Sequence, residues 1–296
     1  MYRCFRLKRF LLFAAVTALA VSFCTVCAII RGRSMLTSAY PGNEAPVPLP
    51  VVMYHSVCNK APSEYSVTPA QLEEDLEWLS CNGFRSVSAE ELIRYTRGCG
   101  ELPEKPVLIT FDDGFYNNLS LALPILEKYD MCAVVSIVGR YTDEYAAADP
   151  HADSYSYLTW QDISALLSSG RIEIGSHTYD MHSGNGGRQG CAMLSGESTE
   201  SYSERLKADI DRLRSELHEK CGTEPVVFAY PFGALSAESL PVLRDSGILM
   251  TLTCREGINY ITRDPDCLYG IFRFNRSGLL SADSFMSVLT EKLPAP

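Results

Sequence analysis

The feature that most constrains the fold is an alternation of short apolar segments with longer amphipathic ones along most of the chain. Residues 107–109, 131–138 and 226–228 are rich in apolar and β-branched side chains and are predicted to be buried strands. Helical patterns lie between such segments, so the strands need crossover connections and should run parallel. The alternation predicts an α/β fold, and by itself it is compatible with either a barrel or an open sheet.

Capping residues mark several helix starts. Thr68 with Gln71, and Ser88 with Glu91, have the spacing of capping boxes, and Pro69 occupies the favoured first helical position. With apolar periodicity elsewhere, the predicted helices are 69–82, 89–97, 118–129, 160–169, 200–221, 237–246 and one that begins at 281. Further strands are predicted at 49–57, 84–87, 248–253 and 271–274. Residues 140–157 are predicted to be a loop, and residues 183–198 a mobile loop.

The N-terminal region has the pattern of a membrane anchor. Residues 10–30 carry no charge and are long enough to cross a bilayer as a helix. The more basic flank precedes this run, which predicts a single-pass protein in the cell membrane with its C-terminal part outside, or a secreted protein if the segment is cleaved. The expected organisation is a basic tip and anchor at 1–33, a proline-rich tether at 34–50, and a folded domain at 51–296.

Charge and cysteine content narrow the function classes. A formal net charge of −10 argues against a nucleic-acid-binding protein, which would present a basic face. Eleven cysteines are present, and the eight beyond the anchor region are scattered singly along the chain. An exported domain could form disulfides, but this spacing favours mostly free, buried thiols.

Two carboxylates follow one of the predicted strands. The sequence Thr-Phe-Asp-Asp-Gly at 110–114 comes directly after the apolar run 105–109. Ligands of α/β folds gather at the carboxyl ends of strands, where Asp112 and Asp113 would lie, and Gly114 permits a sharp turn. Asp-Gly is also common in ordinary β-turns, so this sequence alone does not identify a site.

A pair of histidines follows another predicted strand. Residues 171–176 run into His177 and His182, and the chain contains only five histidines. A spacing of five does not place both rings on one helix face, so the pair must converge from a strand end and the following loop. Single histidines are usually structural, but two imidazoles together with an acidic strand end favour a divalent metal site, with zinc as the first choice.

These motifs, in order along the chain, resemble those of the polysaccharide deacetylases, which are carbohydrate esterase family 4 or the NodB homology domain. The resemblance rests on 110–114, on Ser-His-Thr-Tyr-Asp-Met-His at 176–182, and on Phe-Ala-Tyr-Pro-Phe-Gly at 228–233, and it covers about 50–293. Met-Tyr-His-Ser at 53–56 is most similar to the branch that contains the poly-N-acetylglucosamine deacetylases. The resemblance implies a distorted (β/α) barrel.

The resemblance also implies site residues. Asp113, His177 and His182 would hold a divalent metal, most simply Zn²⁺, with Co²⁺, Ni²⁺ or Mn²⁺ as alternatives. Asp112 would be the general base, and the backbone N–H of Phe232 would stabilise the oxyanion.

The third motif departs from the family pattern. Tyr230, Pro231 and Gly233 are expected to shape a substrate-binding turn around Phe232. Many members begin this motif with an arginine that orients the base, but Ala229 stands there in this chain. Arg273 is a candidate replacement, and it could equally be a surface charge at a strand end.

The expected catalytic acid is also displaced. Family members usually carry a histidine in a C-terminal motif, but no histidine follows His218 in this chain. His55, at the end of the first predicted strand, is the remaining candidate, and the resemblance implies that it takes this role.

The resulting expectation is a metal-dependent hydrolase that removes N-acetyl groups from an N-acetylglucosamine-containing polysaccharide, either peptidoglycan or an exopolysaccharide, outside the membrane. One alternative is a non-catalytic, metal-containing glycan-binding relative. Another is a metal hydrolase of a different amide or ester.

Overall fold

The computed structural model describes residues 45–148, 151–184, 187 and 189–294. Residues Pro46–Pro296 form one compact unit, which holds the fold described below. The predicted anchor at 10–30 lies outside the described residues. Within the described part of the chain, no helix is both long and apolar enough to span a membrane.

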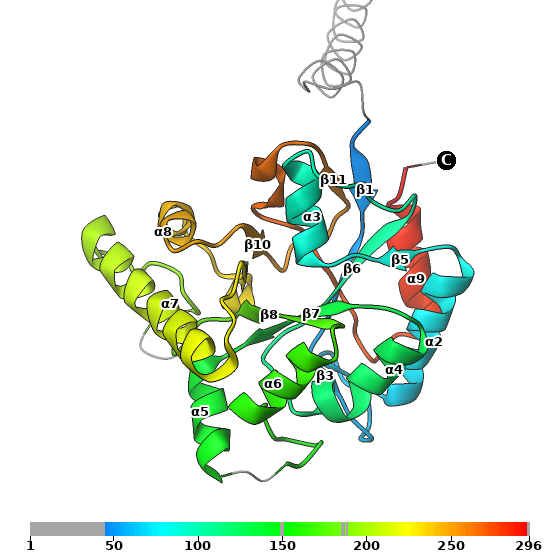
Figure 1. Ribbon diagram of the computed structural model, residues 1–296, viewed down its shortest axis with the longest axis horizontal. Coiled ribbons are helices and arrows are strands. Elements are labelled where there is room, and N and C mark those ends of the chain that lie inside the picture. The colour runs from blue at the N-terminus through cyan, green and yellow to red at the C-terminus, as the bar shows by residue number, and fades with distance from the viewer. Residues whose placement is uncertain (1–44, 149–150, 185–186, 188, 295–296) are drawn as a thin grey trace, which may run out of the picture. The chain divides into compact units, whose positions relative to one another are not determined.

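A parallel sheet is the centre of this unit (Figure 1). Among the described residues it has eight strands in the order β10–β9–β8–β7–β6–β2–β12, with β5 beside the start of β6. The strands are β2 (Val51–Tyr54), β5 (Arg85–Ser86), β6 (Pro106–Phe111), β7 (Ala133–Ile137), β8 (Ile172–Ser176), β9 (Val227–Ala229), β10 (Met250–Leu252) and β12 (Phe274–Asn275). All of their pairings are parallel, which confirms the predicted α/β class.

Helices connect these strands and lie around the outside of the sheet (Figure 1). They are α2 (Pro69–Cys81), α3 (Ala89–Thr96), α4 (Leu123–Lys128), α5 (Gly139–Ala148), α6 (Trp160–Ser168), α7 (Thr199–Cys221), α8 (Ser239–Asp245) and α9 (Ala282–Glu291). The capping boxes at Thr68 and Ser88 are both formed, so the starts of α2 and α3 are confirmed.

The sheet is buried on both faces, as parallel sheets usually are. All six residues of β6 are buried. Val107 and Ile109 belong to a core that also includes residues of α2, α4 and α6, whereas Leu108 belongs to a second core with Val134 and Val227. Successive strand residues point to opposite faces, so the apolar run of β6 serves both cores.

The last part of the chain joins the two edges of the sheet. The Ile271 N–H donates to the Thr251 carbonyl at 2.9 Å, beside β10. Three residues later Phe274 pairs with Val52 of β2, and the Arg276 N–H donates to the Met53 carbonyl at 2.9 Å. The curled sheet therefore has its two edges linked through 271–276, an arrangement consistent with the expected distorted barrel.

Three local predictions need correction. Residues 140–157 were predicted to be a loop, but α5 occupies 139–148, stabilised in part by an Arg140–Glu144 pair one turn apart at 2.8 Å. The tyrosine-rich, polar composition of this segment concealed its helical pattern. The predicted helix 118–129 divides into a π-helical turn, η1 (Asn118–Ala122), and α4, because Pro124 has no N–H for a regular helical bond.

The third correction concerns the first strand, predicted at 49–57. It is divided into β1 (Val47–Leu49), β2 and β3 (Ser56–Val57), and Pro50, which has no N–H to donate, separates the first two. β1 lies within the stretch assigned to the tether and pairs antiparallel with β11 (Asn259–Ile261), a strand that was not predicted. β3 pairs with β4 (Ser66–Val67).

The cysteines are less buried than expected, and part of the 183–198 segment is packed against the rest of the domain. All eight cysteines in the described part of the chain are free, as predicted, but only Cys58 and Cys191 are buried. Cys191 lies in the segment predicted to be mobile, where its carbonyl accepts a hydrogen bond from the Tyr202 hydroxyl at 3.0 Å. The Met193 N–H donates to the Ser236 hydroxyl at 2.9 Å, so this part of the segment packs against the chain near position 236.

A buried ion pair anchors the closing segment. The side chains of Arg276 and of Asp75 on α2 are both 0% exposed, and the arginine Nε donates to the aspartate Oδ2 at 2.6 Å. The Tyr54 hydroxyl donates to the same oxygen at 2.9 Å. Partners of this kind offset the large cost of removing two charges from water.

Replacing Asp75 with alanine should therefore destabilise the domain strongly. Asp75→Ala leaves the buried Arg276 charge without its partner, and we expect the free energy of unfolding to fall by about 3–5 kcal/mol. Urea denaturation measures this change. The matched control is Asp211→Ala, which breaks an exposed pair with Lys207 one turn away on α7 and should change the value by less than about 1 kcal/mol. Similar small effects of both substitutions would contradict an anchoring role for Asp75.

Candidate active site

The positions of the acidic and histidine motifs follow from the sheet. β6 and β8 lie on either side of β7, and all three run parallel. Asp112 and Asp113 directly follow β6, and His177 directly follows β8. The carboxyl ends of parallel strands meet at one edge of a sheet, so residues that are 64 positions apart become neighbours.

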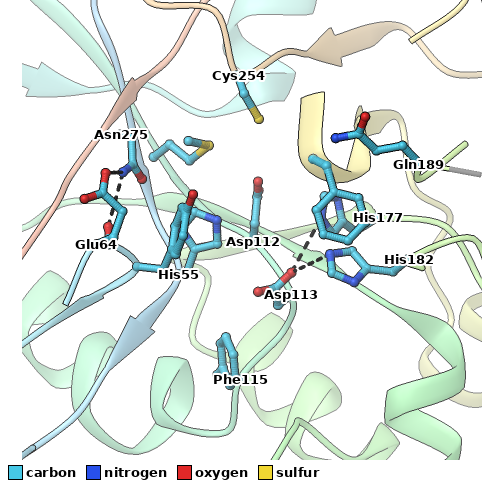
Figure 2. Close-up of a pocket in the computed structure, with 13 residues that line it drawn as sticks. His55, Glu64, Asp112, Asp113, Phe115, His177, His182, Gln189, Cys254 and Asn275 are labelled. Carbon is cyan, nitrogen blue, oxygen red and sulfur yellow. Dashed lines mark hydrogen bonds and ion pairs between the residues drawn. The ribbon is translucent and has the colours of Figure 1, made fainter. Parts of the chain in front are cut away.

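Three of the predicted side chains meet at this edge (Figure 2). Oδ1 of Asp113 lies 3.2 Å from Nε2 of His182 and 3.5 Å from Nε2 of His177. One ligand atom from each residue falls within 4.8 Å of the others. Two ligands of a tetrahedral zinc ion, each about 2.1 Å from the metal, are separated by about 3.4 Å. The spacing therefore suits a shared cation.

The hydrogen bonds of His177 support the same conclusion. Its Nδ1 lies 2.8 Å from the backbone carbonyl of Ala229, and a carbonyl can only accept, so Nδ1 carries the proton. Burial lowers the pKa of His177 and favours the neutral ring. Nε2 then presents a lone pair to the carboxylate of Asp113. Two electron-rich atoms facing each other fit a cation between them.

A tight turn holds Asp113 in place. Asp113 and Gly114 have φ angles of 72° and 74°, so the chain turns through the left-handed region immediately after β6. A Cβ atom added at Gly114 would lie 2.9 Å from the Ile137 side chain and 3.2 Å from its Cα. Only glycine allows the turn to approach the end of β7 so closely.

Asp112 pairs with Arg273 beneath the cavity. The guanidinium donates from Nη1 to Oδ1 and from Nη2 to Oδ2, each at 2.7 Å, and its Nε donates to the Thr253 carbonyl at 2.8 Å. Arg273 is 0% exposed, so the interpretation of it as a surface charge is wrong. Burial alone would raise the pKa of Asp112, but the charge and hydrogen bonds of Arg273 outweigh it and hold that pKa well below its usual range.

A cavity of about 590 Å³ opens over these residues and includes His55 among its lining. Figure 2 shows His55 on the side of Asp112 opposite to His182. Its ring packs edge-on against Tyr65, with 5.1 Å between ring centroids, and its backbone carbonyl accepts a hydrogen bond from the Asn118 side chain at 3.0 Å. The structure thus places the candidate acid in the same cavity as the candidate base.

The third motif contributes one side chain to the cavity. Phe232 lines it, is 48% exposed, and packs its ring 4.5 Å from that of His182. It is the central residue of the turn η2 (Pro231–Gly233), where its φ angle is 58°. The Tyr230 side chain is buried in the core, with its hydroxyl 3.0 Å from that of Ser239. Tyr230, Pro231 and Gly233 therefore shape the turn and do not line the cavity.

Other residues of the cavity lining were not predicted as site residues, among them Glu64, Tyr65, Gln189, Cys254 and Asn275. Asn275 lies two positions after Arg273 in the closing segment, so the two-residue period of an extended chain would have placed both on one face. The other four lie in loops, where the sequence carries no periodic signal.

Comparisons with known proteins are consistent with this geometry. The family described as polysaccharide deacetylase matches residues 100–251. A poly-β-1,6-N-acetyl-D-glucosamine N-deacetylase of Escherichia coli K12 is 28% identical over 227 residues, which cover 70% of this chain and 34% of that protein. The chain thus spans about a third of the length of that relative. The putative polysaccharide deacetylase YxkH of Bacillus subtilis 168 is 28% identical over 249 residues, covering 84% of this chain and 78% of that protein.

Solved structures show the same fold. IcaB from Ammonifex degensii superposes with a TM-score of 0.67 at 25% identity, over 82% of this chain and 96% of that one. A de-N-acetylase from Aggregatibacter actinomycetemcomitans superposes with a TM-score of 0.68 at 24% identity, over 82% of this chain and 99% of that one. The family match spans just over half of the sequence, and the motifs on which the resemblance rests form one cavity. This chain belongs to the polysaccharide deacetylase family.

Proposed function

We propose that this protein is a metal-dependent N-deacetylase that hydrolyses N-acetyl groups of an N-acetylglucosamine-containing polysaccharide. The observation that carries the proposal is the convergence of Asp113, His177 and His182 beside the Asp112–Arg273 pair, at the edge of one cavity. The names of the E. coli and staphylococcal relatives make a poly-β-1,6-linked polymer the first substrate to test.

Asp112 is suited to act as the base. Its low pKa keeps the carboxylate ionised, and Arg273 fixes its orientation through two hydrogen bonds. Each carboxylate oxygen has a second lone pair, so Asp112 can still accept a proton from water. Asp113, His177 and His182 would hold a divalent ion, most simply zinc, whose chemistry when bound is to lower the pKa of water and polarise the acetyl carbonyl.

The remaining roles fall to residues on other sides of the cavity. His55 would donate a proton to the departing amine, since it lies in the cavity on the opposite side of Asp112 from His182. Phe232 would offer its backbone N–H to the developing oxyanion from the turn that lines the cavity. The presence of His55 in the cavity argues against the alternative of a non-catalytic relative, in which the catalytic acid would be missing.

The proposed place of action is outside the cytoplasmic membrane. The support comes from the sequence, where the uncharged run 10–30 follows a basic flank. Peptidoglycan and exopolysaccharides are both found on that side, so an anchor would hold the domain near either substrate.

Acetate release tests the proposed activity. We expect the protein to release acetate from β-1,6-linked N-acetylglucosamine oligomers. Acetate release should stop when a chelator removes the metal and should resume when zinc is added. Fully deacetylated oligomers are the control substrate, and peptidoglycan fragments test the second polymer. Activity that persists after chelation would contradict the metal dependence. No release from any acetylated glycan, with release from other amides or esters, would favour the alternative hydrolase.

Removing the charge of Asp112 should abolish most of the activity without removing the metal. Asp112→Asn keeps the shape of the side chain but not its basicity, so we expect kcat to fall by about 10²–10⁴-fold while zinc affinity stays nearly unchanged. Steady-state acetate release and a zinc titration measure the two effects. Asp211→Asn, on an exposed face of α7, is the matched control and should be fully active. Wild-type turnover by Asp112→Asn would rule this residue out as the base.

A further inference from the structure

We propose that Tyr141, on α5, is a positioning residue of the metal site, whose hydroxyl fixes the tautomer and the orientation of His182. This inference rests on the metal site of the proposed function and adds a residue outside the motifs. It also gives a function to α5, the helix that occupies a segment predicted to be a loop.

The Tyr141 hydroxyl contacts His182 at two points. It lies 3.3 Å from the ring Nδ1 and 3.3 Å from the backbone carbonyl oxygen of the same residue. The other ring nitrogen, Nε2, lies 3.2 Å from Oδ1 of Asp113. The imidazole of His182 is therefore held from one side by tyrosine and presents its opposite nitrogen to the proposed metal.

The hydrogen-bond donors and acceptors around His182 indicate which ring nitrogen carries its proton. A tyrosine hydroxyl has a single proton, and a backbone carbonyl can only accept a hydrogen bond. In the arrangement that we infer, Tyr141 donates to the His182 carbonyl and accepts from Nδ1. Nδ1 must then carry the proton of the neutral ring, which leaves the lone pair on Nε2, the atom that faces Asp113.

His177 reaches the same tautomer with a different partner. Its Nδ1 donates to the Ala229 carbonyl at 2.8 Å, so the backbone of β9 sets its orientation. His182 lies in a loop after β8, and the Tyr141 hydroxyl serves it in the same way. Partners of this kind orient metal-binding histidines and raise their affinity for the ion.

The surroundings of Tyr141 keep its hydroxyl in place. Its ring packs against Tyr157 with 4.6 Å between centroids, and Tyr157 in turn stacks on Phe115 at 4.8 Å. At the start of α5, the Gly139 and Arg140 N–H groups donate to the carbonyls of residues 178 and 179 at 3.1 and 2.9 Å. The helix is thus joined to the segment between the two histidines, and Tyr141 cannot shift independently of it.

Zinc affinity tests the role of the hydroxyl in the full chain. Tyr141→Phe removes only the oxygen, and we expect zinc affinity in a chelator competition titration to fall about 10–100-fold. Tyr145→Phe is the matched control, because it lies on the same helix and packs on the same Tyr157 ring, but its hydroxyl donates to the Tyr155 carbonyl. This control should keep the zinc affinity of the unsubstituted chain. Equal affinity in all three proteins would overturn the inference.

Nitrogen NMR of histidine-labelled protein without metal gives a readout independent of zinc. We expect His182 of the unsubstituted chain to be protonated at Nδ1, and Tyr141→Phe to shift the ring toward the Nε2–H form. Protonation of His182 at Nε2 in the unsubstituted chain would overturn the inference even if Tyr141→Phe fails to fold. Failure of the unsubstituted chain to bind zinc would overturn the metal site of the proposed function, and the role of Tyr141 with it.

Discussion

The parallel alignment of β6, β7 and β8 is the constraint on which the site depends. Because these strands run in one direction, the residues that follow β6 and β8 must emerge at the same edge of the sheet. Asp113 is the second residue after β6 and His177 is the first after β8, and His182 returns to them from the next loop. The left-handed turn at Asp113 and Gly114 then directs the carboxylate toward the histidines. The proposed metal site is thus a consequence of strand order, together with one turn that needs glycine.

A second constraint is the burial of two arginines in the segment that joins the edges of the sheet. The side chains of Arg273 and Arg276 are both 0% exposed, and each is paired with a buried aspartate, Asp112 at the site and Asp75 on α2. Charges buried in this way are stable only with close partners. The pair at Asp75 holds the segment against α2, and the pair at Asp112 uses the same segment to orient the proposed base. The closing of the sheet and the orientation of the proposed base therefore depend on the same few residues.

Much of the fold and of the candidate site could be predicted from the sequence, because the motifs follow apolar strands that are easily recognised. The meeting of Asp113 with the histidines followed from the parallel strands that the helix–strand alternation required. The pairing of Arg273 with Asp112 remained open, because the two residues are 161 positions apart and an arginine in a predicted strand could equally be a surface charge. Tyr141 was missed because a helix with polar and aromatic residues on several faces lacks a clear apolar period. What the sequence could not supply was the tertiary environment of single side chains.

Diffraction data measured on both sides of the zinc absorption edge, from crystals of the zinc-loaded protein, test the central claim most directly. The account predicts one strong anomalous peak, within about 2.0–2.2 Å of an Asp113 carboxylate oxygen and of Nε2 of both His177 and His182. A peak away from these three residues, or a histidine bound through Nδ1, would contradict it.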